Sequence, residues 1–252
     1  MGRYWRKFGC EFEFSSSINE LGEKVIEATR KIYGRKKVHI SYKHHRSLNN
    51  KNWHVKADST TLSELASPVS KYKDLSKICN LIEILKKNNI EITNQDSFHI
   101  HMQVSDCSTD RIITAWLQIA PIIRQCYPKY RRNSEYCKNL SSNTKTGTIA
   151  RIFPWAIEQA EDHHSELSSE KFDINKTVEF RLGEATFDKK TITTFIKFFM
   201  LFLDYAKNME MAKVLCDKNA RCKSLKDVIK LLNIKSKIRD FLFSRIEKFQ
   251  SR

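Results

Sequence analysis

The sequence lacks several features that would assign it to a familiar class of protein. No apolar run approaches the length of a membrane span, and the N-terminus has no apolar core typical of a signal peptide. The seven cysteines include no Cys-x-x-Cys pair, so we expect neither a zinc site of that kind nor a disulfide framework. Internal repeats and low-complexity linkers are also missing. These absences predict a cytosolic protein without membrane contact, with reduced and mostly buried thiols. The length allows one large domain or two small ones, and we predict one over residues 1–252, because four strand-like stretches between residues 8 and 182 share a face and so require one sheet.

Acidic residues are too few to balance the basic ones. The chain carries 29 Asp and Glu against 45 Lys and Arg, which gives a net charge of +16. Basic residues are dense over 30–56, over 129–132, and from Lys213 to the C-terminus. Such a surface attracts polyanions, including nucleotides, nucleic acids and acidic polymers. Alternatively, the positive charge could serve only to keep the protein soluble.

Four short stretches, at residues 8–14, 53–58, 98–102 and 178–182, alternate bulky apolar residues with residues of metal-ligand type. Because side chains alternate across a β-strand, each stretch would present one apolar and one titratable face. Ordinary amphipathic strands with a solvated face would alternate in the same way. These four supply mainly carboxylates and imidazoles, however, and clustered carboxylates repel unless cations neutralise them. The titratable positions are Glu11, Glu13, Lys56, Asp58, His99, His101, Glu179 and Arg181, among which Lys56 is the exception.

Helical periodicity separates these stretches. It predicts helices over 17–34, 74–85, 110–126 and 192–203, followed by basic amphipathic helices, whereas residues 139–175 fit no element clearly. Parallel strands buried on both faces would be continuously apolar, which these are not. We therefore predict an α+β fold, in which a curved, largely antiparallel sheet carries helices on its apolar face and the active site on the other.

The order and spacing of these residues resemble the amidoligases, a branch of the carboxylate-amine ligases similar to glutamine synthetase. The resemblance covers residues 8–205 and leaves 206–252 as a basic helical C-terminal part. Upstream of the last strand the family usually has an Arg-Tyr segment followed by Asn, whereas this chain has His163-His164-Ser165-Glu166-Leu167. The matching segments are Gly9-Cys-Glu11-Phe-Glu13-Phe14, Trp53-x-Val55-x-x-Asp58-Ser59, Glu64-Leu-Ala-Ser67-Pro68, His99-Ile-His101, Arg132-x-x-Ser134-x-Tyr136-Cys137 and Thr177-Val-Glu179-Phe-Arg181.

The resemblance implies a glutamine synthetase-like fold around an ATP site with two divalent ions, Mg²⁺ or Mn²⁺. By this resemblance Arg181 would stabilise the transferred phosphoryl group, and His101 and Arg132 would lie near the nucleotide. The implied metal ligands form two sets, Glu13 and Glu64 with Asp58 as a further candidate, and Glu11 with His99 and Glu179.

The implied activity is ATP-dependent joining of a carboxylate to an amine through an acyl phosphate. Asp58 is also a candidate for the base that deprotonates the amine. Either substrate could be attached to a peptide or a nucleic acid, and the related ligases often form oligomers. Two alternatives stay open, a metal-dependent nuclease or phosphoesterase using the same acids, and a non-catalytic nucleic-acid-binding protein on a ligase scaffold.

Overall fold

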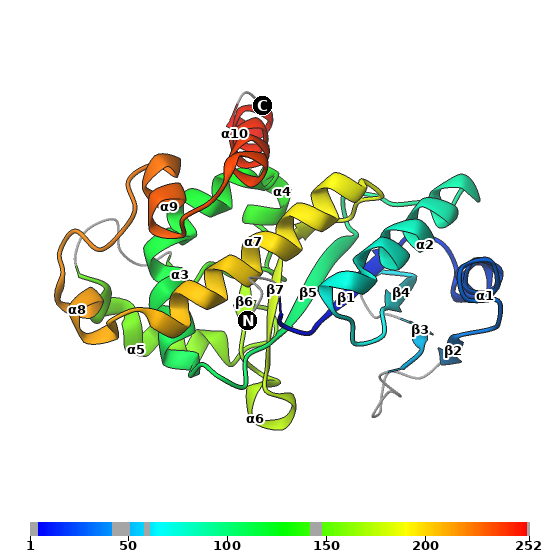
Figure 1. The fold of residues 1–252 in the computed structure, drawn as a ribbon, viewed down its shortest axis with the longest axis horizontal. Helices are drawn as coiled ribbons and strands as arrows, with labels where there is room; N and C mark the ends of the chain where they lie inside the picture. Colours follow the sequence, from blue (N-terminus) through cyan, green and yellow to red (C-terminus); the bar gives the residue numbers. More distant parts are fainter. Residues whose placement is uncertain (1–4, 42–50, 58–60, 142–147, 251–252) are drawn as a thin grey trace. The chain divides into compact units, whose positions relative to one another are not determined.

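The computed structural model describes residues 5–41, 51–57, 61–141 and 148–250. The chain divides into two compact units, each built from two separate segments (Figure 1). Unit 1 comprises Met1–His101 with Gly183–Ile196, and unit 2 comprises Met102–Leu182 with Lys197–Arg252. The expectation of a single catalytic domain over 1–252 stays a prediction.

The sheet of unit 1 is largely antiparallel, as predicted. Its strands lie in the order β2-β3-β4-β1-β5, in which β4 is antiparallel to both β1 and β3, and β2 is parallel to β3. Strands β1, β3 and β5 match predicted stretches, whereas β2 and β4 were not predicted. Their bounds are Phe8–Phe14 (β1), Val38–Ser41 (β2), Trp53–Lys56 (β3), Ser63–Ala66 (β4) and Ser97–Gln103 (β5), of which the last two residues belong to unit 2.

Helix α1, Ile18–Tyr33, covers this sheet. It begins at Ser17, whose hydroxyl accepts a hydrogen bond from the Glu20 N–H, and it ends at Gly34, which adopts the left-handed φ of 68°. These are the predicted ends of the helix. Helix α1 contacts β2, β3 and β4, and helix α2, Leu75–Lys87, packs beside it (Figure 1). The predicted helix on an apolar sheet face is confirmed.

The apolar face of the sheet forms the core of unit 1. In β1 the side chains of Phe8, Cys10, Phe12 and Phe14 are buried, and the ring of Phe12 stacks on that of Phe98 at 4.8 Å between centroids. Gly183 lies close against strand β5, because a Cβ added there would lie 2.3 Å from the Phe98 carbonyl oxygen. Any larger residue at this position would therefore push backbone against backbone.

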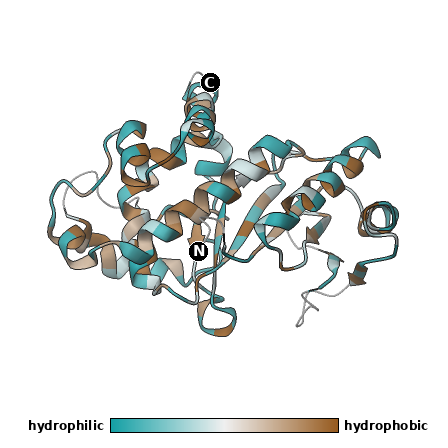
Figure 2. Ribbon diagram, viewed as in Figure 1, coloured by the Kyte–Doolittle hydropathy of each residue, from teal (hydrophilic) through white to brown (hydrophobic). Residues whose placement is uncertain are grey.

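Unit 2 has a mainly helical structure around an aromatic core. Strand β6 pairs antiparallel with β7, placing Leu167 opposite Phe180, whose ring stacks on Phe199 at 3.8 Å. Trp116 lies against these rings. Figure 2 shows hydrophobic residues along the middle of helix α7, which supplies Phe199. The elements are α3 (Thr109–Ile123), α4 (Lys129–Arg132), α5 (Ile149–Ala160), β6 (Leu167–Ser168), α6 (Phe172–Asn175), β7 (Thr177–Glu184), α7 (Lys189–Asn208), α8 (Met211–Cys216), α9 (Leu225–Leu231) and α10 (Ser236–Gln250), with β7 and α7 shared between the units.

Two further expectations concern the chain as a whole. All seven cysteines are free thiols, and five of them are buried, which confirms the prediction that most of them lie in the core. Among the described residues, no helix combines the length and hydropathy needed to cross a bilayer.

Candidate active site

Three charged side chains lie in a row across the sheet of unit 1. In the β1–β4 register Glu13 is opposite Glu64, and in the β3–β4 register Glu64 is opposite Lys56. Residues opposite one another in an antiparallel pair share a face, so all three point away from the apolar core. The Lys56 ammonium lies 2.7 Å from the Glu64 carboxylate and 3.8 Å from that of Glu11. Glu11 and Glu13, which strand parity placed on one face, thus share that face with Glu64 and Lys56.

Strand β5 adds two histidines to this face. The His101 Nε2 lies 3.2 Å from the Glu11 carboxylate, and the His99 ring lies 4.0 Å from Glu11 and 3.7 Å from Glu13. His99 is 3% exposed, and its Nε2 shares a hydrogen bond of 2.6 Å with the Ser97 hydroxyl. Ser97 was not singled out in the sequence, although it precedes His99 and His101 at the same spacing of two.

The electrostatics of the cluster reflect crowding of negative charge. Burial, followed by repulsion from Glu11, raises the pKa of Glu64 to about 8, even though the Lys56 ammonium opposes the shift. Burial would also raise the pKa of Glu11, but His101 and Lys56 outweigh it, and the pKa of Glu11 lies well below its ordinary value. The pKa values of Glu64 and Glu11 are therefore shifted in opposite directions, as in a site that needs additional positive charge.

The donor set of this cluster suits divalent metal ions. Glu11, Glu13 and Glu64 supply carboxylate oxygens, and His99 supplies an imidazole nitrogen, all within unit 1. Oxygen-rich sets bind Mg²⁺, and a single imidazole among carboxylates also admits Mn²⁺. The donor chemistry of this cluster thus fits hard divalent cations.

The remaining predicted residues, apart from Asp58, belong to unit 2. Glu179 and Arg181 are on β7 in unit 2, where the Arg181 guanidinium binds the Glu179 carboxylate at 2.6 Å. Arg132 ends helix α4 in the same unit, with a partly buried side chain. Asp58 falls outside the described residues. The roles expected of these four residues stay predictions.

A buried carboxylate that the sequence did not reveal lies in unit 2. Glu166 is fully buried, and its Oε1 accepts hydrogen bonds from Trp116 Nε1 at 2.9 Å and from the Leu140 N–H at 3.2 Å. Its second oxygen binds the Arg124 guanidinium, which also donates to the Arg132 carbonyl. The Glu166 carbonyl accepts the Arg181 N–H at 3.0 Å. Glu166 lies in the segment 163–167, where the sequence departs from the amidoligase pattern.

A turn just before this segment brings Asp162, His163 and His164 together. One Asp162 oxygen lies 3.7 Å from His163 Nδ1 and 3.6 Å from His164 Nδ1, close enough for the three groups to share a cation. Asp162 already binds the Lys138 ammonium at 2.6 Å and the His164 N–H at 2.8 Å. The hydrogen bond from Lys138 is the main cause that lowers the pKa of Asp162, so a local ion pair accounts for this cluster.

Comparison with known proteins identifies the family. A family model described as "Putative amidoligase enzyme" matches residues 5–203, most of the chain. The chain belongs to this family. The match spans the carboxylate and imidazole cluster of unit 1 and also the β7 residues Glu179 and Arg181.

The other comparisons are more distant. A chain in the crystal structure of the complex between the prokaryotic ubiquitin-like protein Pup and its ligase PafA resembles this protein, with a TM-score of 0.46 and 10% identity. The similarity covers 98% of this protein and 65% of that chain, so this protein spans less than two thirds of the length of that chain. No curated protein sequence matches.

Proposed function

We propose that the protein is an ATP-dependent ligase that joins a carboxylate to an amine through an acyl phosphate. The observation that carries this proposal is the convergence of Glu11, Glu13, Glu64 and His99 on one sheet face in a member of the amidoligase family. A carboxylate attacking the γ-phosphate of ATP brings two anions together. The reaction therefore needs concentrated positive charge near the transferred group.

The proposed metal ligands follow the two sets expected from the sequence. Glu13 and Glu64 would hold one divalent ion, with Asp58 as a further candidate. Glu11 and His99 would hold a second, to which the sequence pattern adds Glu179. Bound Mg²⁺ would neutralise phosphoryl oxygens and so lower the barrier to their transfer.

The remaining steps fall to side chains of the chain itself. Arg181 presents a planar guanidinium suited to a transferring phosphoryl group, and His101 and Arg132 are proposed to bind nucleotide phosphates. The incoming amine must lose its proton before it displaces phosphate, and Asp58 is the proposed base. Glu179, which binds the Arg181 guanidinium at 2.6 Å, would keep that group oriented.

A screen for ADP release tests the proposal. Purified protein with ATP and Mg²⁺ is offered pools of carboxylates and amines, and we expect ADP release that depends on both substrates and on the metal. Glu11→Gln should lower turnover by at least about a hundredfold, a typical loss when one electrostatic group of an active site is removed. Glu23→Gln, which removes an exposed carboxylate from helix α1, is the matched control and should have no effect.

Two results would contradict the ligase. Turnover that survives EDTA would exclude the proposed metal chemistry. Cleavage of DNA or RNA in the presence of Mn²⁺ without ATP would instead identify a hydrolase that uses the same acids.

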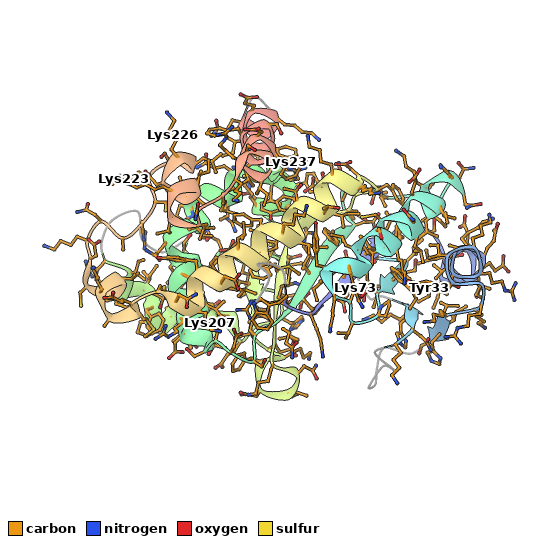
Figure 3. All side chains as sticks on the ribbon, in the orientation of Figure 1. Tyr33, Lys73, Lys207, Lys223, Lys226 and Lys237 are labelled. Carbon is orange, nitrogen blue, oxygen red and sulfur yellow. The ribbon has the colours of Figure 1, made fainter. Side chains whose placement is uncertain are left out.

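We further propose that the basic C-terminal part contacts a polyanionic substrate, such as an acidic peptide or a nucleic-acid-linked acid. Residues 206–252 contain 13 of the 45 Lys and Arg but only 5 of the 29 Asp and Glu, so they carry +8 of the net +16. Figure 3 labels Lys223 and Lys226 at helix α9 and Lys237 on helix α10, and all three side chains are exposed. Exposed lysines attract polyanions without needing a shaped pocket.

The salt dependence of binding tests this contact. Changing Lys223, Lys226, Lys230 and Lys237 to Gln should weaken binding of an acidic peptide or oligonucleotide and reduce the slope of log K against log salt. A second protein removes the same amount of charge from unit 1 and should bind almost as the original does. Its changes are Lys71, Lys73, Lys86 and Lys87 to Gln, all at exposed positions. An unchanged slope in the first protein would dismiss the contact.

A further inference from the structure

Lys56 places an ammonium group among the carboxylates of the proposed metal site. It lies on β3 directly opposite Glu64, and its Nζ is 2.7 Å from Glu64 and 3.8 Å from Glu11. The Lys56 side chain is 24% exposed, and those of Glu64 and Glu11 are 11% and 22% exposed. In the sequence this residue interrupted an otherwise ligand-like set.

The position of Lys56 gives it a definite electrostatic task. Glu13 and Glu64 are opposite each other across β1 and β4, and like charges in that arrangement repel. The ammonium opposes the upward shift of the Glu64 pKa and, after His101, helps to lower the pKa of Glu11. Lys56 therefore neutralises part of the cluster when no other cation is present.

A divalent ion would need the same oxygen atoms. Metal–oxygen bonds of about 2.0–2.2 Å to Glu64 would bring the ion next to an ammonium that is already in contact with that carboxylate. A divalent ion and an ammonium group that contact the same carboxylate in a partly buried site repel each other strongly. Lysine has a flexible four-carbon stem, so it can move its charge toward solvent while its backbone stays in the strand.

We propose that Lys56 is a built-in counter-ion which competes with divalent ions for the Glu64 and Glu11 carboxylates, one from each proposed ligand set, and so sets the metal affinity of the site. In the metal-free protein the ammonium holds the two carboxylates together. When the ion binds, the ammonium leaves them and turns outward. This inference rests on the proposed metal site but not on the identity of the reaction.

Direct metal binding by the full-length protein tests the competition. Titration with Mn²⁺ in the absence of ATP, followed by electron paramagnetic resonance, should show that Lys56→Met binds about tenfold more tightly than the original protein. Lys56→Arg keeps the charge and should remain within about threefold of the original. The matched control is Lys31→Met, because Lys31 also binds a glutamate at 2.7 Å, on an exposed face of helix α1. This control should leave the Mn²⁺ affinity unchanged.

Ionic strength separates contact competition from a general effect of charge. Long-range attraction is largely screened at high salt, because the Debye length falls to about 3 Å at 1 M. The gain from Lys56→Met should therefore persist in 0.5 M NaCl. A gain that vanishes there, or an affinity that is unchanged or weaker in Lys56→Met, would overturn the inference.

A measurement on the unaltered protein guards against misfolding of the variant. Acetylation of lysines, followed by mass spectrometry, should modify Lys56 several-fold faster in the presence of Mn²⁺, while Lys31 reacts at a constant rate. Slower or unchanged modification of Lys56 would contradict displacement. Metal binding with this behaviour but without ligase turnover would refute the proposed function and leave the role of Lys56 intact.

Discussion

Two buried carboxylates, Glu64 in unit 1 and Glu166 in unit 2, show how different environments give the same residue type different roles. Glu166 binds Trp116, a backbone N–H and the Arg124 guanidinium, so each of its oxygens has a donor. Glu64 binds the Lys56 ammonium but lies opposite Glu13 and near Glu11, and its pKa is raised to about 8. One carboxylate is matched by its neighbours, and the other is crowded by like charges.

This contrast separates groups that hold the fold from groups available to a ligand. A buried ion pair stabilises the fold only while both of its members are present, because removing one of them leaves the other as an uncompensated buried charge. A crowded carboxylate weakens the ligand-free protein and becomes favourable when a cation arrives. Substitutions in the two clusters should therefore differ in the sign of their effect on stability.

Glu166→Ala should have the largest effect. It leaves the Arg124 guanidinium without its carboxylate in the interior of unit 2, and the free energy of unfolding should fall by about 3–5 kcal/mol. Urea unfolding followed by circular dichroism measures this loss. A fall of less than about 1 kcal/mol would mean that Glu166 is not the structural partner described here.

Trp116→Phe tests one hydrogen bond of the same cluster. The change removes the Nε1 donor that lies 2.9 Å from Glu166 and keeps an aromatic ring against Phe180. Leaving a buried acceptor with one donor fewer should lower the free energy of unfolding by roughly 1–3 kcal/mol. The double variant with Glu166→Ala should lose less than the sum of the two single losses, since both changes act on the same contact.

Ser97→Ala moves the comparison to unit 1. The Ser97 hydroxyl shares a 2.6 Å hydrogen bond with His99, so its loss should lower the free energy of unfolding by only about 0.5–1.5 kcal/mol. The Mn²⁺ affinity should fall by about tenfold or more, because groups that orient a ligand strongly affect metal binding. Equal Mn²⁺ affinity in Ser97→Ala and the original protein would remove His99 from the set of ligands.

Glu64→Gln should have the smallest effect on stability, and unlike the other substitutions it should tend to stabilise the protein. It replaces the crowded carboxyl group that faces Glu13, whose pKa is already raised to about 8, with a neutral amide of the same size, so the free energy of unfolding should change by less than about 0.5 kcal/mol or rise slightly. Binding of the Mn²⁺ ion assigned to Glu13 and Glu64 should nevertheless be lost, while the ion assigned to Glu11 and His99 should still bind. A destabilisation close to that of Glu166→Ala would abolish the distinction between the two clusters.

The sequence revealed the parts of the fold in which local pattern and tertiary environment agree. Strand alternation predicted β1, β3 and β5, and the Ser17 and Gly34 signals predicted both ends of helix α1. Strand β4, Ser63–Ala66, escaped prediction because all four of its residues are buried and show no alternation between apolar and polar positions. Strand β2 escaped because it is short and lies in a basic segment.

The same reasoning explains which site residues could be found. Glu11, Glu13, His99 and His101 recur at a spacing of two, which the pleat of a strand turns into a shared face. Glu64 came from the family resemblance, and its place opposite both Glu13 and Lys56 depends on β4. Glu166 had no local signal, because its partners are 26 to 50 residues away and only the folded chain brings them together.

The site also depends on Gly183, a residue without any charged or polar side chain. With its backbone against the Phe98 carbonyl, it fixes the strand immediately before His99. A methyl group at position 183 would force that carbonyl to move and would so disturb the backbone that positions the neighbouring His99. A random mutagenesis screen for metal-dependent activity would therefore score this glycine as essential, although it offers no atom to substrate, nucleotide or ion.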